Sequence, residues 1–199
     1  MNSQPFNNLS VIIDWLQFTI TENNITVDNI ITLLKLDVNN FITLDHGKMG
    51  YKQQKTYNDI SILYEGNKGM GIHVIFTGQA CRYYETEHNL IELIQRINES
   101  KGKLTRIDLA MDDRTGDVIP FKQLIKDITN ANIVSKWKSN VEIIKRSNKD
   151  AEIKGHTISL GSRSSRLFMR IYDKALEQKI EGIWNRIELE IKKEYAEQV

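Results

Sequence analysis

The sequence is poor in the residues that mark secreted, zinc-clustered or linker-rich proteins. Its 199 residues include only two prolines and one cysteine, Cys81. A single cysteine excludes an internal disulfide and any multi-cysteine zinc site, and it favours a reducing, cytoplasmic compartment. Because proline is scarce and no repeat or low-complexity stretch is visible, no linker is evident. We therefore expect a single domain over residues 1–199.

Long apolar runs and an excess of charge of one sign are missing too. No segment approaches the ~20 consecutive apolar residues of a membrane helix, and the N-terminus is polar, so we expect no membrane partner. The formal net charge is +1, which does not by itself indicate a polyanion-binding protein. Any interaction with nucleic acid must therefore depend on local clusters of charge.

Several common catalytic signatures are also absent. No GxxxxGK loop, nucleophile elbow or dinucleotide fingerprint occurs, which disfavours an ATPase, a hydrolase or a dehydrogenase. The four histidines stand apart, without the His-x-His pair of many nicking enzymes. His73 lies in a β-rich run and could face the acidic residues described below, but such a histidine more often packs in the core.

The spacing of apolar residues predicts an α+β fold. Apolar residues at helical spacing follow Thr26, which can cap a helix N-terminus. The same spacing recurs over 82–98, where we expect the longest helix, with its end at Gly102. A further helix is expected to begin near Pro120. The order of strands and helices favours a central, mostly antiparallel sheet with helices packed on one face. Period-two patterns predict strands over 14–21, 60–64, 72–77, 104–112, 141–145, 156–160, 167–173 and 184–192.

Three of these strands carry polar residues at every second position. Such a row has two interpretations, a solvated outer face whose ion pairs contribute little energy, or a functional surface of the sheet. Three rows in one chain favour the functional interpretation. The rows are Arg106, Asp108 and Asp112; Phe168, Arg170 and Tyr172; and Arg186, Glu188 and Glu190.

Carboxylates from two of the rows could bind a metal ion. Acids that converge on a sheet repel one another unless a divalent cation neutralises them, and oxygen-only ligands select Mg²⁺ or Mn²⁺. Asp108 with Glu188 is the first choice of ligand pair. Such a cation would polarise a phosphoryl oxygen, which makes a nucleic-acid phosphodiester a sensible substrate.

Tyr172 is a candidate nucleophile. A tyrosine with a pKa of about 10 is protonated at neutral pH, so it needs a metal or a base to attack. Arg170, Lys174 and Arg166 lie close enough in sequence to favour the phenolate or to hold the phosphate. The alternative is a half-buried strand tyrosine with its hydroxyl at the rim of the sheet.

Two basic segments are candidates for phosphate contacts. The turn 161–166, GSRSSR, offers backbone amides, serines and the arginines Arg163 and Arg166. The second segment has Trp137 nearby, which could stack on an unpaired base, although an ordinary solvated hairpin fits equally well. Its cations are Lys145, Arg146, Lys149 and Lys154.

Taken together, the blocks resemble the Rep-trans family of rolling-circle replication initiators and relaxases from plasmids, phages and integrative elements. Blocks IDWLQFTI and GIHVIFTGQACRYYE are similar to its opening strands. LTRIDLAMDD, GSRSSRLFMRIYDK and WNRIELEIK are similar to its site-bearing blocks, and the matches span nearly the whole chain. Two departures are that relatives can carry an acid at the position of Ile75, and that they commonly continue into a C-terminal helical DNA-recognition region.

The resemblance implies a metal-dependent nick of one DNA strand at an origin, a 5′-phosphotyrosine adduct on Tyr172 and later rejoining. It places Mg²⁺ or Mn²⁺ on Asp108 and Glu188, with Glu190 as an additional ligand. We also assign Arg106 to DNA contacts. The expected partners are single-stranded DNA or an extruded origin hairpin, a host helicase and a second subunit. A non-catalytic origin-binding protein and a water-using nuclease are the alternatives.

Overall fold

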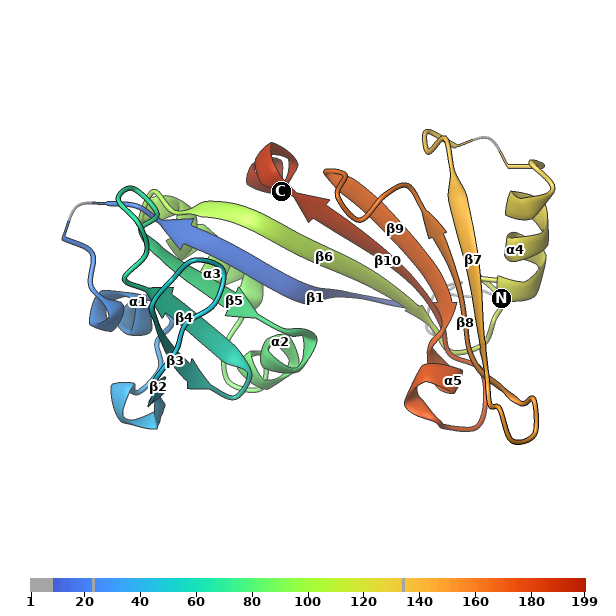
Figure 1. Cartoon of the computed structure of the whole chain (residues 1–199), viewed down its shortest axis with the longest axis horizontal. Coiled ribbons are helices and arrows are strands. Elements are labelled where there is room, and N and C mark those ends of the chain that lie inside the picture. Colours follow the sequence, from blue (N-terminus) through green and yellow to red (C-terminus); the bar gives the residue numbers. More distant parts are fainter. Residues whose placement is uncertain (1–8, 23, 134) are drawn as a thin grey trace, which may run out of the picture. The chain divides into compact units, whose positions relative to one another are not determined.

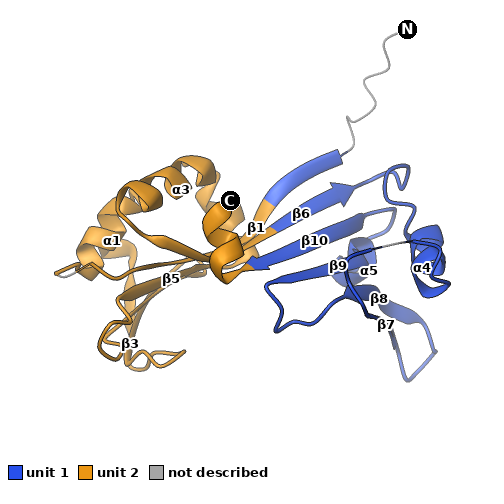
Figure 2. Ribbon diagram, turned by 90° about the horizontal axis from the view of Figure 1, so that it is seen from above, with its two compact units in different colours: residues 1–12, 109–191 blue, residues 13–108, 192–199 orange. Residues whose placement is uncertain are grey.

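The computed structural model describes residues 9–22, 24–133 and 135–199. The fold is α+β, with a large antiparallel sheet and several helices, as the sequence predicted (Figure 1). Two compact units divide the described residues (Figure 2). Unit 1 comprises 9–12 and 109–191, and unit 2 comprises 13–108 and 192–199. Within the described residues, no helix is long and apolar enough to cross a membrane.

Unit 2 contains one run of strands and most of the helices. Its neighbouring strands follow the order β2-β3-β4-β5-β1-β6, and the pairs from β2 to β1 are antiparallel. Its elements are β1 (Leu9–Ile20), α1 (Val27–Leu33), η1 (Val38–Asn40), β2 (Ile42–Leu44), β3 (Gln53–Tyr57), β4 (Ile60–Tyr64), β5 (Ile72–Phe76), α2 (Gly78–Tyr84), α3 (Leu90–Glu99), β6 (Lys103–Asp113) and η2 (Lys193–Gln198), with β1, β6 and β10 passing from one unit into the other.

Helix α1 begins where the sequence predicted. The Thr26 side chain accepts a hydrogen bond from the Asn29 amide at 3.2 Å, and the Asn29 side chain accepts one from the Thr26 amide at 3.0 Å. This reciprocal pair satisfies amides that a helix N-terminus leaves without partners. The strands predicted over 60–64 and 72–77 are confirmed as β4 and β5, which pair antiparallel with Leu63 opposite His73.

The longest helix that the structure describes, α3, lies in the predicted region 82–98, but the prediction of a single helix there is wrong, because α2 also extends into it. Helix α2 ends at Tyr84, and the Asn89 side chain accepts hydrogen bonds from the amides of Ile91 and Glu92, which starts α3 afresh. A side-chain cap of this kind competes with a continuous helix. The left-handed residue after α3 is Lys101, with φ of 52°, rather than Gly102.

The sheet of unit 2 is buried on both faces. On one face, the Phe76 ring makes an edge-on contact with Tyr84 of α2, with ring centroids 5.4 Å apart. On the other face, Tyr51, Leu63 and Ile75 form a smaller cluster. Successive residues of β5 therefore point to opposite faces of the sheet, Phe76 toward α2 and Ile75 toward the smaller cluster.

Unit 1 is built on the second run of strands, in the order β6-β10-β9-β8-β7. Helix α4 covers one face, where Phe121 and Ile125 pack against Ile158, Leu160 and Ile171. The pairs β10–β9, β9–β8 and β8–β7 are antiparallel. The elements are α4 (Phe121–Thr129), β7 (Asn140–Arg146), β8 (Ile153–Leu160), β9 (Leu167–Asp173), α5 (Lys174–Gln178) and β10 (Asn185–Lys192).

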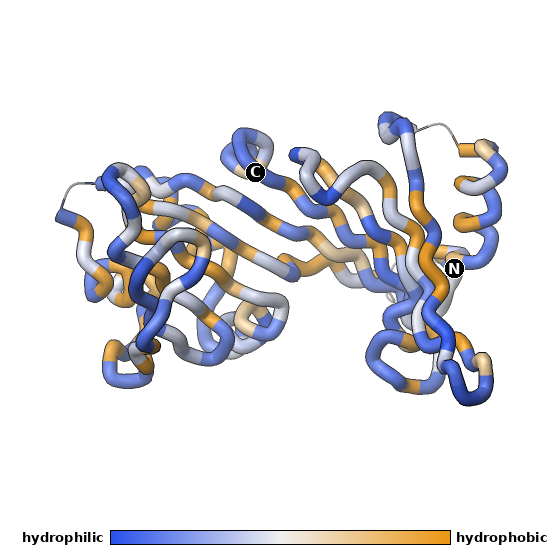
Figure 3. The backbone as a smooth tube through the Cα atoms, viewed as in Figure 1, coloured by the Kyte–Doolittle hydropathy of each residue, from blue (hydrophilic) through white to orange (hydrophobic). Residues whose placement is uncertain are grey.

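The alternation along β9 and β10 leaves the other face of this sheet polar. Hydrophobic and hydrophilic residues succeed one another along these strands (Figure 3). Ile171 belongs to the apolar cluster under α4, so Tyr172 and Arg170 on either side of it point to the opposite face. This second face carries the candidate site.

Candidate functional site

The register of β9 and β10 places two of the predicted polar rows next to each other. Tyr172 lies opposite Arg186, and Arg170 lies opposite Glu188. Directly opposed residues of an antiparallel pair share one face of the sheet at about 5 Å between Cβ atoms. Two of the polar rows that the sequence predicted therefore lie side by side in unit 1.

Glu188 connects the two strands. The Tyr172 hydroxyl donates a hydrogen bond to Glu188 Oε2 at 3.0 Å, and Arg170 Nη2 donates to Glu188 Oε1. Tyr172 is 6% exposed and Glu188 is 3% exposed. These values rule out the interpretation that this row is a solvated outer face and also the tyrosine with its hydroxyl at the rim.

The surroundings of Tyr172 keep its hydroxyl protonated in the resting structure. Burial, and then the negative charge of Glu188, raise the pKa of Tyr172 above its ordinary value of 10.0, while Arg186 acts in the opposite sense. Lys174 Nζ lies 5.5 Å and the guanidinium carbon of Arg170 lies 5.8 Å from the centroid of the tyrosine ring. The predicted cations are therefore near Tyr172, although they do not outweigh burial.

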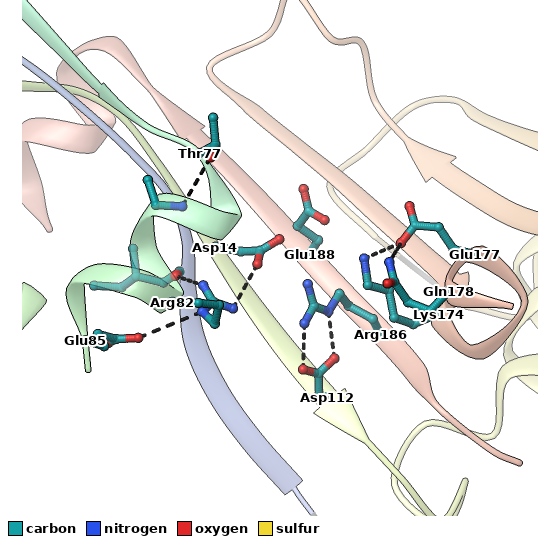
Figure 4. Close-up of polar contacts among 12 residues, drawn as sticks. Asp14, Thr77, Arg82, Glu85, Asp112, Lys174, Glu177, Gln178, Arg186 and Glu188 are labelled. Carbon is teal, nitrogen blue, oxygen red and sulfur yellow. Dashed lines mark hydrogen bonds and ion pairs between the residues drawn. The ribbon is translucent and has the colours of Figure 1, made fainter. Parts of the chain in front are cut away.

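A second buried charge pair lies in the same unit and was not predicted. Arg186 donates to both oxygens of Asp112 at 2.6 Å (Figure 4). Trp184 Nε1 donates to Asp112 Oδ1 at 2.7 Å. Burial opposes ionisation of Asp112, but the hydrogen bonds from Arg186 and Trp184 outweigh it and hold its pKa below 3.8. Asp112 is thus committed to Arg186. Figure 4 also shows Lys174 directed at Glu177, with which it forms an ion pair.

Asp108 belongs to unit 2 and is held by its own strand. Arg106 donates to both carboxylate oxygens of Asp108, at 2.8 and 2.6 Å, and the Arg106 guanidinium carbon lies 4.8 Å from the centroid of a Trp15 ring. Asp108 is 1% exposed. Its interactions therefore make it a buried, neutralised carboxylate, and Arg106 faces aromatic and acidic partners.

Ile75, where the sequence departs from the family that it resembles, lies in an apolar environment. Ile75 is 4% exposed and packs with Tyr51 and Leu63. His73, two residues earlier, shares a hydrogen bond of 2.8 Å with Thr19 through Nδ1, and its buried Nε2 has no hydrogen-bond partner. Burial, together with the charge of Lys48, lowers the pKa of His73 to about 4.

The donor chemistry of the predicted metal ligands suits Mg²⁺ or Mn²⁺, because all are carboxylates. Glu190 is buried and follows Glu188 on the same face of β10. Among the residues that the structure describes, however, no group of three or more His, Cys, Asp or Glu side chains is arranged to hold a metal ion. Asp108 and Glu188 are each paired with an arginine instead.

The predicted phosphate contacts lie on exposed parts of unit 1. Arg163 and Arg166 are exposed in the turn between β8 and β9. Lys145 and Arg146 are exposed on β7. The Trp137 ring is partly buried and packs against the apolar cluster under α4.

Two further features of these units were not predicted from the sequence. Arg82 of α2 forms an ion pair of 3.1 Å with Asp14 of β1 (Figure 4). Arg114 lies over the ring of Trp184. The only sequence signal for the second contact is that Arg114 follows two aspartates at the end of β6. The periodicity of a sequence does not show whether such a charged residue contacts a distant residue or only solvent.

Known proteins of similar sequence and fold are replication initiators. A model described as "Replication initiation factor" matches residues 102–199, and one described as "Rolling Circle replication initiation protein N-terminal domain" matches residues 10–93. A solved rolling circle replication initiator protein from Geobacillus stearothermophilus is 30% identical, with a TM-score of 0.88, over 96% of this chain and 77% of that chain.

The chain belongs to the replication initiation factor family. A curated relative, a candidate DNA relaxase named NicK from Bacillus subtilis (strain 168), is 26% identical over 165 residues, which cover 76% of this chain. The chain spans about half the length of this relative, 47%. The RIYDK and RIELE blocks, which resemble the site-bearing blocks of the family, lie within the residues matched by the replication initiation factor model.

Proposed function

We propose that this protein, acting as one nicking domain, cleaves one DNA strand at an origin by transesterification and later rejoins it. The observation that carries the proposal is the bond from the Tyr172 hydroxyl to the buried carboxylate of Glu188, beside Arg170 and Lys174. A hydroxyl bonded to a potential base, with cations close by, is the arrangement that an activated nucleophile needs.

In the proposed reaction, Tyr172 Oη attacks the phosphorus atom of a phosphodiester and its proton passes to Glu188 Oε2, 3.0 Å away. The bond from phosphorus to the 3′ oxygen breaks, and that oxygen leaves as a hydroxyl after taking up a proton from water. The 5′ phosphate remains joined to Tyr172. Because the phosphotyrosine conserves the ester, attack by a 3′ hydroxyl reverses the step.

The cations supply the electrostatic part of the reaction. Arg170 and Lys174 both lie within 6 Å of the Tyr172 ring. Positive charge at this distance favours the phenolate and the phosphate that it attacks. Further from the site, Arg163, Arg166, Lys145 and Arg146 would hold DNA phosphates, with Arg106 as a contact from unit 2.

A divalent metal would be held by Glu188 and Glu190, with Asp108, which the sequence names with them. The donors are hard oxygens, so Mg²⁺ or Mn²⁺ fits them. When bound, the metal supplies Lewis-acid polarisation of a phosphoryl oxygen. Arg170 and Arg106 neutralise Glu188 and Asp108 in its place, so these side chains would have to give up part of their present bonds.

One observation favours a second function, a non-catalytic origin-binding protein. Both principal acids are already paired with arginines, and Ile75 contributes no ligand. Such a protein would keep the basic segments and the fold but would not cleave DNA. Metal-dependent activity separates the two functions.

The test is incubation with single-stranded oligonucleotides from the origin of the element that encodes the protein, with Mn²⁺ or with chelator. Denaturing electrophoresis then detects a protein–DNA adduct. We expect a metal-dependent adduct that is lost in Tyr172→Phe and retained in Tyr195→Phe, a matched change in the 3₁₀ helix η2. Cleavage without an adduct would indicate a water-using nuclease, and binding without cleavage would indicate the non-catalytic protein.

A further inference from the structure

Trp184 lies immediately before β10 and is fixed beside the nucleophile strand. Its carbonyl oxygen accepts hydrogen bonds from the amides of Lys174, at 2.7 Å, and Ala175, at 3.3 Å. Lys174 is two residues beyond Tyr172. The indole Nε1 donates to Asp112 at 2.7 Å, so both the backbone and the ring of Trp184 are held.

Arg114 covers this ring. Its guanidinium carbon is 3.4 Å from the centroid of the indole, which is the separation of two groups in van der Waals contact. Arg114 is exposed, and its charge is one of the causes that lower the pKa of the nearby Asp112. Contact with the aromatic face places its guanidinium over the ring.

The loop that carries Arg114 is itself rigidly held. The two oxygens of the buried Asp113 accept hydrogen bonds from the amides of Thr115, Gly116, Val118 and Ile119 at 2.7–3.0 Å. A carboxylate with several amide donors fixes the loop in one conformation. Arg114 is thus presented at a set position by Asp113 on one side and by Trp184 on the other.

Two further cations lie near Trp184, and each is paired with an acid, Arg186 with Asp112 and Lys174 with Glu177. The guanidinium carbon of Arg186 is 5.7 Å and Lys174 Nζ is 6.0 Å from the indole centroid. A planar guanidinium on an indole, with further cations nearby, is suited to an unpaired base and its phosphate, because both planar groups stack on any base. Trp137, the tryptophan that the sequence suggested for this role, packs under α4 instead.

We propose that Arg114 and Trp184 form a platform that stacks with one unpaired nucleobase of a single-stranded DNA. This inference rests on the proposed function for the location of that base, next to the phosphate that Tyr172 attacks. Binding of the base itself does not require cleavage. The platform would align the strand before the reaction and would tolerate any base identity.

The experiment compares two probes of equal charge, a thymidine oligonucleotide of roughly a dozen nucleotides and an abasic oligonucleotide of the same length. Fluorescence anisotropy gives the dissociation constant of each, and their ratio reports the contribution of the bases alone. We expect the wild-type protein to prefer the thymidine strand by about tenfold, the effect of one stacked base. Arg114→Lys, which keeps the charge but loses the planar group, should bring the ratio close to one.

Two further variants sharpen the test. Trp184→Phe retains a ring and should keep part of the preference. Lys126→Ala removes one exposed charge from α4 and should weaken both probes equally, leaving the ratio unchanged. Thermal unfolding of each variant checks that it is folded. A wild-type ratio near one, or a wild-type ratio retained in Arg114→Lys, would overturn the platform.

The outcome for the platform is separable from the outcome for nicking. A base preference that depends on Arg114, in a protein that forms no adduct with origin DNA, would support the platform and reject the proposed nicking. An adduct formed by a protein whose base preference is unchanged in Arg114→Lys would support the proposed nicking and reject the platform.

Discussion

Two regions of this protein bury polar side chains, and the two regions provide different kinds of partner for them. On β6, β9 and β10 in unit 1 several buried groups are charged, and Asp112 and Glu188 each have an arginine partner. Around β3, β4 and β5 in unit 2 they are neutral. Gln54 Nε2 donates to Ser61 Oγ at 3.1 Å, and Thr19 is bonded to His73.

The difference shows where the protein retains charge at a cost. A buried charge needs several partners to offset the loss of hydration, whereas a neutral group needs one hydrogen bond. Hydrophobic or neutral pairs would fill the β9–β10 face at lower cost. Retained charges beside a tyrosine therefore point to chemistry rather than to stability, in keeping with the clustering of such groups at functional sites.

The largest expected effect comes from breaking a charged pair. Arg186→Met leaves Asp112 buried without its bidentate partner, and we expect the free energy of unfolding to fall by about 3–5 kcal/mol. Denaturant unfolding followed by circular dichroism measures this change. The double variant Asp112→Leu/Arg186→Met removes both charges and should recover most of the loss.

A double variant as unstable as the single one would contradict this account of the β9–β10 face. It would mean that packing by the arginine stem, rather than pairing of charge, supports the strands. Trp184 also loses its acceptor in the double variant, so a small residual loss is expected.

The second effect depends on pH and belongs to the neutral region. The folded-state pKa of His73, about 4, lies below its ordinary value of 6.5, so the unfolded chain binds a proton first as the pH falls. Stability is complete above about pH 6.5 and should fall by roughly 3 kcal/mol at most between pH 6.5 and 4. Unfolding free energies measured across this window test it.

His73→Phe is the matched variant, because it keeps an aromatic ring in the stack with Tyr51. The variant should lose most of the slope between pH 6.5 and 4. The other strongly shifted acid does not interfere, because hydrogen bonds hold the pKa of Asp113 at about 2 and its contribution is lost only below pH 4. An unchanged slope would assign the dependence to other groups.

Much of the fold followed from the sequence because its signals are local. The period of two that fixed β9 at Leu167–Asp173 needs only the strand itself, and so does the Thr26 cap of α1. The short strands β2 and β3 and helix α5 were not predicted. Ile42–Leu44 and Lys174–Gln178 have only three and five residues, too few for a period to be recognised.

The site followed only in part, because its contacts are not local. The face shared by Tyr172 and Arg170 was predictable from alternation alone. The bond from Tyr172 to Glu188 joins residues 16 apart, and the bond from Arg186 to Asp112 joins residues 74 apart. Such pairs depend on strand order and register, which a single sequence does not specify.

The smallest effect compares one neutral hydrogen bond with one charged bond. Thr19→Val removes the 2.8 Å bond to His73 Nδ1 and should lower the unfolding free energy by about 1 kcal/mol. Trp184→Phe removes a 2.7 Å bond to the carboxylate of Asp112 and should lower it by about 1.5–3 kcal/mol, because hydrogen bonds to charged groups contribute more. Measured side by side in denaturant, equal losses would show that charge gives the β9–β10 face no stronger hydrogen bonds than the neutral face has. A larger loss in Trp184→Phe would mean that stronger hydrogen bonds to the carboxylate offset the cost of burying its charge. The same bonds would then also hold Trp184 in place beside Tyr172.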